Sequence, residues 1–194
     1  MNEFPAERIH LAYLREKKET AFKFHAKKSM LGFTLYTKPD YECKQFHKNL
    51  NKALTKFAKK ELKRLIIQAP PRVGKSEGAS RRLPAFIYGL NPDAQIIAAS
   101  YSSSLAVAMN RDVQKVIDSE KYYALFPKTR LYGPQMQGEK TNKEWQRNNQ
   151  GFEIVDHKGK YKCAGVGGGI TGIGGDYLIC DDLYKDWKQA SSKT

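Results

Sequence analysis

The sequence lacks the features that mark secreted, membrane-spanning and zinc-binding proteins. Its 194 residues include only three cysteines, widely spaced and without a Cys-X-X-Cys pair, so neither a disulfide framework nor a zinc site is indicated. The four histidines also lack metal-ligand spacing. No apolar run approaches the roughly 20 residues that cross a bilayer, and acidic residues near the start argue against a signal peptide. We therefore expect a soluble, cytoplasmic protein with no membrane partner.

Acidic residues are scarce relative to basic ones. The formal net charge is +14, and residues 1–64 contribute +9 of it, with 16 Lys and Arg against 7 Asp and Glu. Such a surface suits a polyanion, most simply nucleic acid, because phosphate contacts release counterions whatever the base sequence. A basic helix that only confers solubility would have the same composition, so charge alone leaves both interpretations open.

The spacing of apolar residues predicts an α/β protein. A basic helix is expected over residues 6–30, and the helix expected over 41–60 has the three-and-four spacing of one that packs on a core. Farther along, short apolar runs alternate with helical patterns, which indicates a parallel sheet with right-handed crossovers. The predicted strands are 65–69, 94–100 and 177–180, with two more around a turn at 157–159, and the further helices are 75–88, with a kink or break at Pro84, and 103–118.

Residues 69–76 read APPRVGKS and lack the first glycine of a phosphate-binding loop, but otherwise match its pattern. The segment follows a predicted buried strand and opens a predicted helix, which is the setting that such a loop requires. Pro70 and Pro71 have no N–H group. The donors that hold phosphate are expected later, between Val73 and Ser76, where the helix N-terminus adds partial positive charge. The prolines therefore stiffen the entry without removing these donors.

Three side chains of this loop have expected roles in nucleotide binding. Lys75 would reach the terminal phosphates, and the Ser76 hydroxyl would ligate Mg²⁺. Arg72 adds a second cation, which either grips phosphate or faces solvent.

A pair of carboxylates follows the last predicted strand, in the stretch YLICDD. A phosphate loop needs a carboxylate at the end of a neighbouring strand to complete a magnesium site. Asp181 is the candidate on the metal side, directly or through water, and Asp182 is the candidate that orients the attacking water. The same pair could instead cap a helix.

Five stretches carry a resemblance to a known family: KPDYECKQFHKNL, RLIIQAPPRVGKSE, AASYSSSLAVAMNRDV, YYALFP and GVGGGITGIGGDYLICDDLYKD. They resemble the ATPase domain of the large terminase subunit of tailed bacteriophages, the motor that packages DNA into an empty capsid. The Pro-Pro-Arg loop is characteristic of this family, and its arginine, here Arg72, looks like a phosphate contact. The resemblance implies a P-loop NTPase fold of the additional-strand, RecA- and helicase-like class, with a parallel sheet flanked by helices.

The resemblance also implies Mg²⁺-dependent hydrolysis of ATP that drives packaging. The region of Tyr41, Gln45 and His47 matches the place where terminases and helicase-like ATPases hold adenine, although each side chain could instead pack on the sheet. The candidates are Lys75, Asp182, Arg72 and Arg111 for catalysis; Pro71, Arg72, Val73, Gly74, Lys75, Ser76, Glu77 and Gln45 for ATP binding; and Ser76 and Asp181 for the metal.

The chain departs from the family pattern in the active-site residues. Family members usually carry Asp-Glu at the second motif, and the aspartate at position 182 has a shorter reach toward water. Ile173 stands where one branch has an arginine that can complete a neighbouring subunit's site. Arg111 is the first candidate to replace this arginine, and Arg147 is the second.

The sequence also stops at Thr194, before the coupling motif and nuclease domain of the family. We expect a basic helical segment at 1–60 that packs on a P-loop ATPase core at 61–194, with a sheet that can be incomplete. This predicts either a fragment of a longer subunit or a split or truncated gene product whose own turnover can be weak.

The expected partners are double-stranded DNA, a small terminase subunit and the capsid portal. A ring homo-oligomer, a pentamer, is expected in the assembled motor and a monomer in isolation, in the cytoplasm of an infected bacterial host. One alternative is a nucleotide-binding interaction module that does not hydrolyse ATP, which the missing C-terminal half and Ile173 favour. The other is a small-molecule kinase, although nothing in the sequence resembles a lid for a second substrate.

Overall fold

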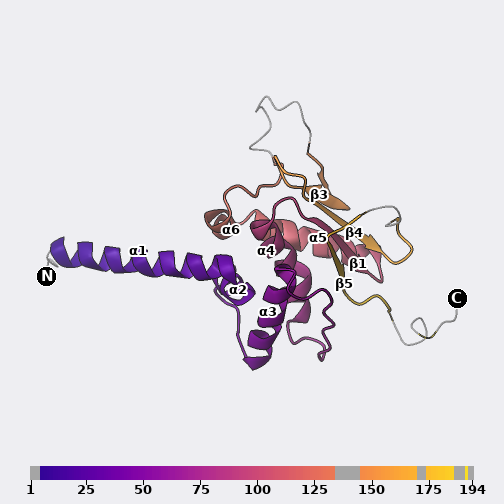
Figure 1. Ribbon diagram of the computed structural model, residues 1–194, viewed down its shortest axis with the longest axis horizontal. Coiled ribbons are helices and arrows are strands. Elements are labelled where there is room, and N and C mark those ends of the chain that lie inside the picture. The colour runs from indigo at the N-terminus through magenta and orange to yellow at the C-terminus, as the bar shows by residue number, and fades with distance from the viewer. Residues whose placement is uncertain (1–4, 134–144, 170–173, 186–190, 192–194) are drawn as a thin grey trace.

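The chain folds as an α/β structure in which helices flank a mixed five-stranded sheet (Figure 1). The computed structural model describes residues 5–133, 145–169, 174–185 and 191. Within these residues, no helix combines the length and the apolar character that a membrane crossing requires.

The sheet has the strand order β2-β3-β4-β1-β5. The three strands at one end are parallel, since β1 pairs with β4 on one side and with the edge strand β5 on the other, whereas β2 and β3 add an antiparallel extension beyond β4. The sequence had predicted a parallel sheet, and the structure corrects this: the sheet is mixed. The strands are β1 (Gln95–Ser100), β2 (Arg147–Asn148), β3 (Gly151–Glu153), β4 (Lys160–Gly165) and β5 (Tyr177–Cys180).

Parallel pairing brings the carboxyl ends of three strands to one edge of the sheet. Ser100 of β1 lies opposite Gly165 of β4, and Ala99 lies opposite Cys180 of β5. The central strand β1 is buried from its second residue onward, as expected for a strand covered on both faces. The residues that follow β5 consequently leave the sheet beside the end of β1.

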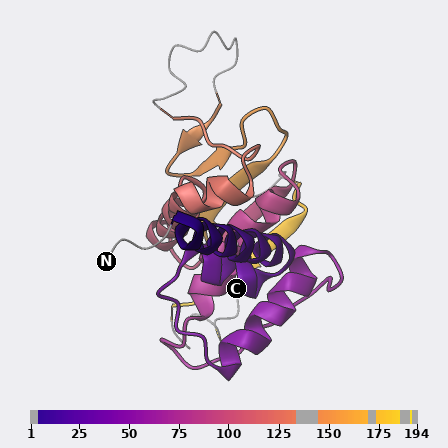
Figure 2. The same cartoon turned by 90° about the vertical axis from the view of Figure 1, so that its left-hand side faces the viewer.

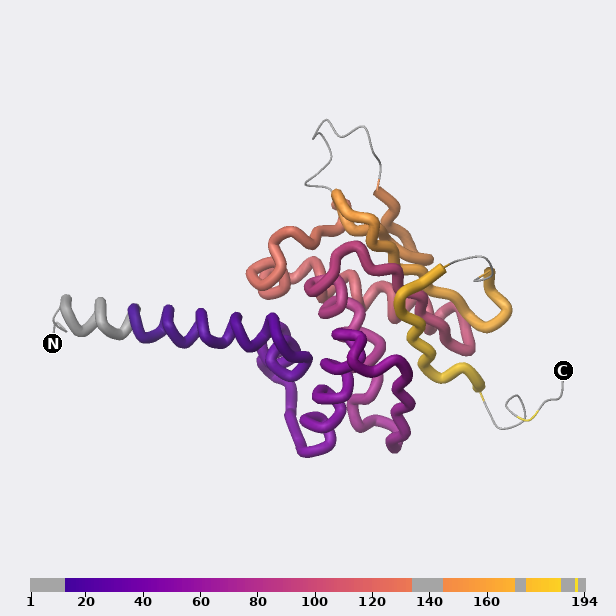
Figure 3. The backbone as a smooth tube through the Cα atoms, viewed as in Figure 1, coloured from indigo at the N-terminus to yellow at the C-terminus, as the bar shows by residue number. Residues whose placement is uncertain are grey.

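The strand predicted at residues 65–69, directly before the 69–76 loop, does not form. Residues 59–74, between α3 and the next helix, are irregular (Figure 3), and Ile66 is 85% exposed. β5 is the last strand of the sheet, and a cavity of about 760 Å³ separates it from residues 64–67. The apolar run therefore has no adjacent strand edge to bond with, and a lone strand cannot satisfy its backbone groups.

The basic helix predicted over 6–30 is confirmed as α1, and a short second helix, α2, which was not predicted, follows it directly. In Figure 2, α1 extends away from the sheet and points toward the viewer, while α2 turns onto the core. Ser29 marks the break, because its hydroxyl accepts a hydrogen bond from Gly32 N–H and caps α2. The helices are α1 (Pro5–Lys28), α2 (Met30–Thr37), α3 (Gln45–Ala58), the π-helix η1 (Glu77–Arg82), α4 (Leu83–Leu90), α5 (Ser103–Ile117) and α6 (Glu120–Leu125).

The helix after residues 69–76 begins at Lys75 and runs through η1 into α4. A kink or break was predicted at Pro84, but the helix continues past it without a break, by way of the π-helical turns of η1. Leu83 N–H donates to Gly78 O, five residues back, so the chain widens just before the proline. Pro84 then lies in the first turn of α4, where its missing N–H costs little.

Candidate functional site

The carboxylate pair Asp181-Asp182 leaves the end of β5 in a fixed backbone conformation. Asp181 N–H donates to Ala99 O, and Tyr101 N–H donates to Asp182 O, both over 2.9 Å, so β1 holds both residues. Asp182 has a φ of 48°, in the left-handed region that few non-glycine residues adopt. Aspartate tolerates this region better than most residues do, and such backbone conformations cluster at functional sites.

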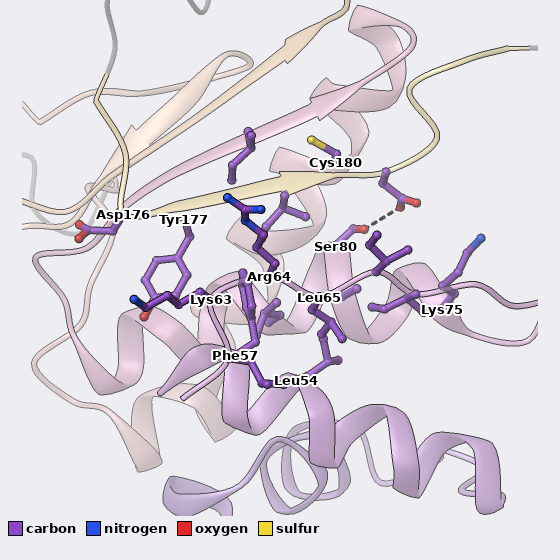
Figure 4. Close-up of a pocket in the computed structure, with 18 of the residues that line it drawn as sticks. Leu54, Phe57, Lys63, Arg64, Leu65, Lys75, Ser80, Asp176, Tyr177 and Cys180 are labelled. Carbon is purple, nitrogen blue, oxygen red and sulfur yellow. Dashed lines mark hydrogen bonds between the residues drawn. The ribbon is translucent and has the colours of Figure 1, made fainter. Parts of the chain in front are cut away.

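Ser80 joins the helix of the 69–76 loop to this carboxylate pair. Its hydroxyl donates a hydrogen bond of 2.6 Å to Asp181 Oδ2, drawn as a dashed line in Figure 4. Ser80 is buried in η1, four residues after Ser76. Ser80 was not among the predicted site residues, although its spacing of four from Ser76 put both serines on one side of a predicted helix.

One cavity brings together the predicted lysine and the two predicted carboxylates. Lys75, Ser80, Asp181 and Asp182 all line the cavity of about 760 Å³ beside β5. Figure 4 shows Lys75 near Ser80 at one end, with Asp176 at the other. The lining also includes three cations, Lys60, Lys63 and Arg64. Its apolar part comes from α3, α4, β5 and the irregular run before the loop: Leu54, Phe57, Leu65, Ile67, Leu83 and Ile179.

The 69–76 loop turns twice through left-handed backbone conformations. Arg72 has a φ of 61° and Gly74 a φ of 81°, after which Lys75 and Ser76 begin the helix. The first turn of a helix has N–H groups without intrahelical partners, and its dipole favours an anion there. Pro71 and Arg72 are exposed, whereas the side chains from Val73 to Glu77 are half-buried.

The start of α3 lies against this loop. His47 Nε2 lies 3.0 Å from Val73 O. Gln45 is the first residue of α3, is exposed, and donates to Asn49 Oδ1 over 3.2 Å. Of the predicted adenine-side residues, His47 therefore contacts the loop directly, and Gln45 faces solvent beside it.

Glu77 binds two arginines of its own helix. Its carboxylate accepts hydrogen bonds from Arg82 Nε at 2.7 Å and from Arg81 at 3.2 Å. Burial raises the pKa of Glu77, but the hydrogen bonds and positive charges of Arg82 and Arg81 outweigh it, so the pKa lies below its usual value. Arg82 also donates to Thr37 Oγ1 over 2.6 Å. Arg82 therefore joins Glu77, at the start of the helix, to Thr37 of α2.

The two arginines that are candidates to complete a neighbouring subunit's site lie in different environments. Arg111 is exposed on α5, away from the cavity lining. Arg147 pairs with Asp118 and donates to Gln114 Oε1 and Tyr132 O. Arg147 is thus held within the fold. Ile173 lies outside the described residues.

The donor atoms around Asp181 are hard oxygen ligands of the kind that Mg²⁺ takes. Among the residues that the structure describes, no group of three or more His, Cys, Asp or Glu side chains could hold a metal by itself. Mg²⁺ commonly binds through one or two carboxylates and keeps its other positions for water and phosphate oxygens. Since Ser80 bonds to Oδ2 of Asp181, Oδ1 remains for a metal or its water. The residues therefore fit an Mg²⁺ ion that is coordinated both by the protein and by phosphate oxygens.

A comparison with protein families gives a match over most of the chain. The model described as terminase large subunit, T4likevirus-type, N-terminal, matches residues 66–194. The matched range includes the 69–76 loop, Ser80 and the carboxylate pair, and it covers well over half of the chain. Neither the curated proteins nor the solved structures gave a match.

Proposed function

The chain belongs to the family of large terminase subunits of the T4likevirus type, which points to a role in phage DNA packaging, and we propose that it hydrolyses ATP to drive this packaging. The observation that carries the proposal is the convergence of Lys75 and the pair Asp181-Asp182 on one cavity. A cationic side chain at a helix start that shares a cavity with carboxylates at the end of a parallel strand is the arrangement that phosphoryl transfer needs.

In this proposal residues 61–194 form a P-loop NTPase core and residues 1–60 pack on it. Lys75 binds the terminal phosphates of ATP, and the N–H groups from Val73 to Ser76 bind phosphate oxygens. Bound Mg²⁺, held by Asp181 and the Ser76 hydroxyl, supplies charge neutralisation at the phosphates.

The remaining site residues have supporting roles in the proposal. Asp182 orients the attacking water from its left-handed turn, which β1 fixes. Exposed Arg72 is free to swing onto phosphate, and Gln45 lies on the adenine side. Pro71 and Glu77 shape the loop and its helix. Arg111, exposed on α5, is the candidate that reaches a neighbouring subunit in a pentameric ring.

The exposed face of α3 supports DNA as a partner. Lys44, Lys48, Lys52 and Lys56 recur at every fourth residue and are all exposed, so they form one stripe, here called the α3 lysine stripe. Residues 45–58 contain no acidic side chain. The opposite face of α3 is buried on the core. A cationic row on a fixed helix suits the phosphates of double-stranded DNA, with the small terminase subunit or the portal as other candidate partners.

The irregular conformation of residues 62–70 favours a second candidate function. Without a neighbouring strand, this segment does not tie the loop to the sheet. A chain that binds nucleotide without hydrolysing it is the corresponding alternative, and it would act as an interaction module.

Phosphate release from Mg²⁺-ATP tests the proposal against this alternative. We expect the chain to release phosphate in the presence of DNA, and Asp182→Asn to lower the rate by at least about a hundredfold, as for a lost water-orienting group. Glu61→Gln, an exposed change near the cavity, is the control. ATP binding without phosphate release at high protein concentration would establish the alternative.

A further inference from the structure

His47 lies between two backbone groups that have fixed hydrogen-bonding roles. Lys44 N–H can only donate, and it lies 3.0 Å from Nδ1, so Nδ1 accepts. Val73 O can only accept, and it lies 3.0 Å from Nε2, so Nε2 carries the proton. The neutral imidazole with its proton on Nε2 is therefore the form that satisfies both contacts.

The ring is held in place from several sides. The ring centroids of Tyr41 and Phe46 lie 5.3 and 5.5 Å from that of His47, both nearly edge-on. Asn51 Nδ2 donates to the His47 carbonyl over 2.8 Å, one turn farther along α3. The position of Nε2 is thus set by α3 and its aromatic neighbours.

Gly74 allows His47 to approach the loop. A Cβ at position 74 would lie 3.2 Å from His47 Nε2, tighter than most such contacts, and the φ of 81° disfavours any other residue. Glycine at this position therefore serves both the turn and the contact with His47.

The contact fixes the orientation of the Val73–Gly74 peptide plane. In a trans peptide the carbonyl and the next N–H point in opposite directions, and the chain contains no cis bond among its described residues. Because Val73 O faces His47, the Gly74 N–H faces away from α3. This N–H is one of the donors that the proposed function assigns to phosphate.

We propose that His47 is a positioning residue that holds the Val73–Gly74 peptide plane for phosphate binding and so sets the affinity of the loop for nucleotide. That the loop binds the phosphates of ATP rests on the proposed function, whereas the effect of His47 on the conformation of the loop does not. His47 also couples the adenine-side segment at 41–47 to the phosphate side, since one ring contacts both.

Two variants separate the contact with Val73 from the cap of α3. His47→Asn keeps a short amide that can accept from Lys44 N–H, as capping side chains do, but it does not reach Val73 O. His47→Gln is one methylene longer and can present an amide N–H near the position of Nε2. If His47 acts as proposed, glutamine restores what asparagine loses.

The experiment measures amide hydrogen exchange of residues 69–76 without nucleotide, together with ATP affinity by calorimetry, in wild type and both variants. We expect His47→Asn to raise exchange in this segment and to weaken ATP binding, each by about tenfold, since a hydrogen bond is worth on the order of 1 kcal/mol. The melting temperature should fall by no more than about 4 °C, and His47→Gln should stay within about threefold of wild type in exchange and affinity.

The outcomes separate this inference from the proposed function. Equal exchange in wild type and His47→Asn, or a global loss of protection in both variants, would overturn the positioning role. Faster exchange with unchanged ATP affinity would overturn its link to nucleotide. If wild type binds no ATP, the proposed function fails, while the exchange data still decide whether His47 holds the loop.

Discussion

Ser80 Oγ donates to Asp181 Oδ2 over 2.6 Å, and this contact fastens the helix of the 69–76 loop to the carboxyl end of β5. The two residues are 101 positions apart in the sequence. Because Ser80 is buried and its partner lines the cavity, the bond fixes which oxygen of Asp181 is turned toward the helix. The orientation of a residue proposed to hold Mg²⁺ therefore depends on a serine outside the loop pattern.

Ser80→Ala removes this bond and frees the Asp181 carboxylate to rotate. We expect phosphate release to fall about tenfold, because a misplaced ligand costs on the order of 1.4 kcal/mol in the transition state, and the Mg²⁺ concentration for half-maximal rate to rise. Steady-state rates across a Mg²⁺ titration check this. Ser104→Ala, an exposed change on α5, is the matched control. An unchanged Mg²⁺ requirement would show that Ser80 is only a packing residue.

Glu77→Gln breaks a half-buried ion pair with Arg82, whose side chain is only 9% exposed. At pH 7 we expect unfolding to become easier by about 3 kcal/mol, because Arg82 loses its ionic partner in a poorly hydrated place. Urea unfolding measures the difference, and exposed Glu61→Gln controls for the change of charge.

The same variant has a defined pH dependence. The folded-state pKa of Glu77 lies below the ordinary value of 4.5, so the unfolded chain takes up the proton first as pH falls. Its stabilisation is complete above the ordinary pKa and is lost as pH falls through the folded pKa. The stability difference between wild type and Glu77→Gln should therefore shrink as pH falls below the ordinary pKa of 4.5. A difference independent of pH would contradict the ion pair.

Lys48→Gln together with Lys52→Gln removes the centre of the α3 lysine stripe. If the stripe contacts DNA phosphates, the slope of log affinity against log salt should fall by about 2, one for each lysine. Fluorescence anisotropy with duplexes of unrelated sequence measures this. The double variant Lys121→Gln and Lys128→Gln makes the same charge change near α6. Equal slopes in the two double variants would locate the DNA surface elsewhere.

Two buried tyrosines offer a matched test of the core. Tyr122 OH donates to Ala85 O over 2.9 Å, whereas the Tyr161 hydroxyl has no hydrogen-bond partner among the described residues. We expect Tyr122→Phe to destabilise by about 1 kcal/mol and Tyr161→Phe to be neutral or stabilising, because removing a buried unpaired hydroxyl relieves its desolvation. Urea unfolding of both variants checks the sign, and an equal loss in the two would contradict the assigned bonds.

Much of the fold follows from local patterns in the sequence. The helix predicted at 103–118 is Ser103–Ile117, and the strand predicted at 177–180 is confirmed with the same bounds. The two strands around the 157–159 turn are confirmed as the antiparallel pair β3 and β4. These elements carry their own periodicity, turn residues or caps, so local sequence suffices.

The failures lie where pairing between distant segments decides the structure. Residues 65–69 have the apolar character of a buried strand, but a strand also needs a neighbour, and only β1 pairs with β5 among the described residues. The residue types of this run were interpreted correctly, and the tertiary context was missing. Helix α2 was missed for a different reason: its signal is local, a cap in which Ser29 accepts a hydrogen bond from Gly32 N–H, and it was not recognised in the sequence.

The candidate site shows the same division. The loop pattern and the carboxylates after β5 were visible in the sequence, and the structure brings Lys75, Asp181 and Asp182 to one cavity. The contacts of Ser80 with Asp181 and of His47 with Val73 join residues 101 and 26 positions apart. No local signal specifies such contacts, because they arise from how α3, η1 and β5 pack.

Calorimetric titration of ATP in the presence of Mg²⁺, with wild type and Lys75→Ala, measures whether the 69–76 loop binds the terminal phosphates through Lys75. Lys63→Ala, a change of another exposed lysine in the cavity lining, is the control. The account predicts one ATP per chain in wild type and in Lys63→Ala, and at least about tenfold weaker binding in Lys75→Ala, on the order of 1.4 kcal/mol for the lost phosphate contact. Equal affinity in Lys75→Ala and wild type would contradict it.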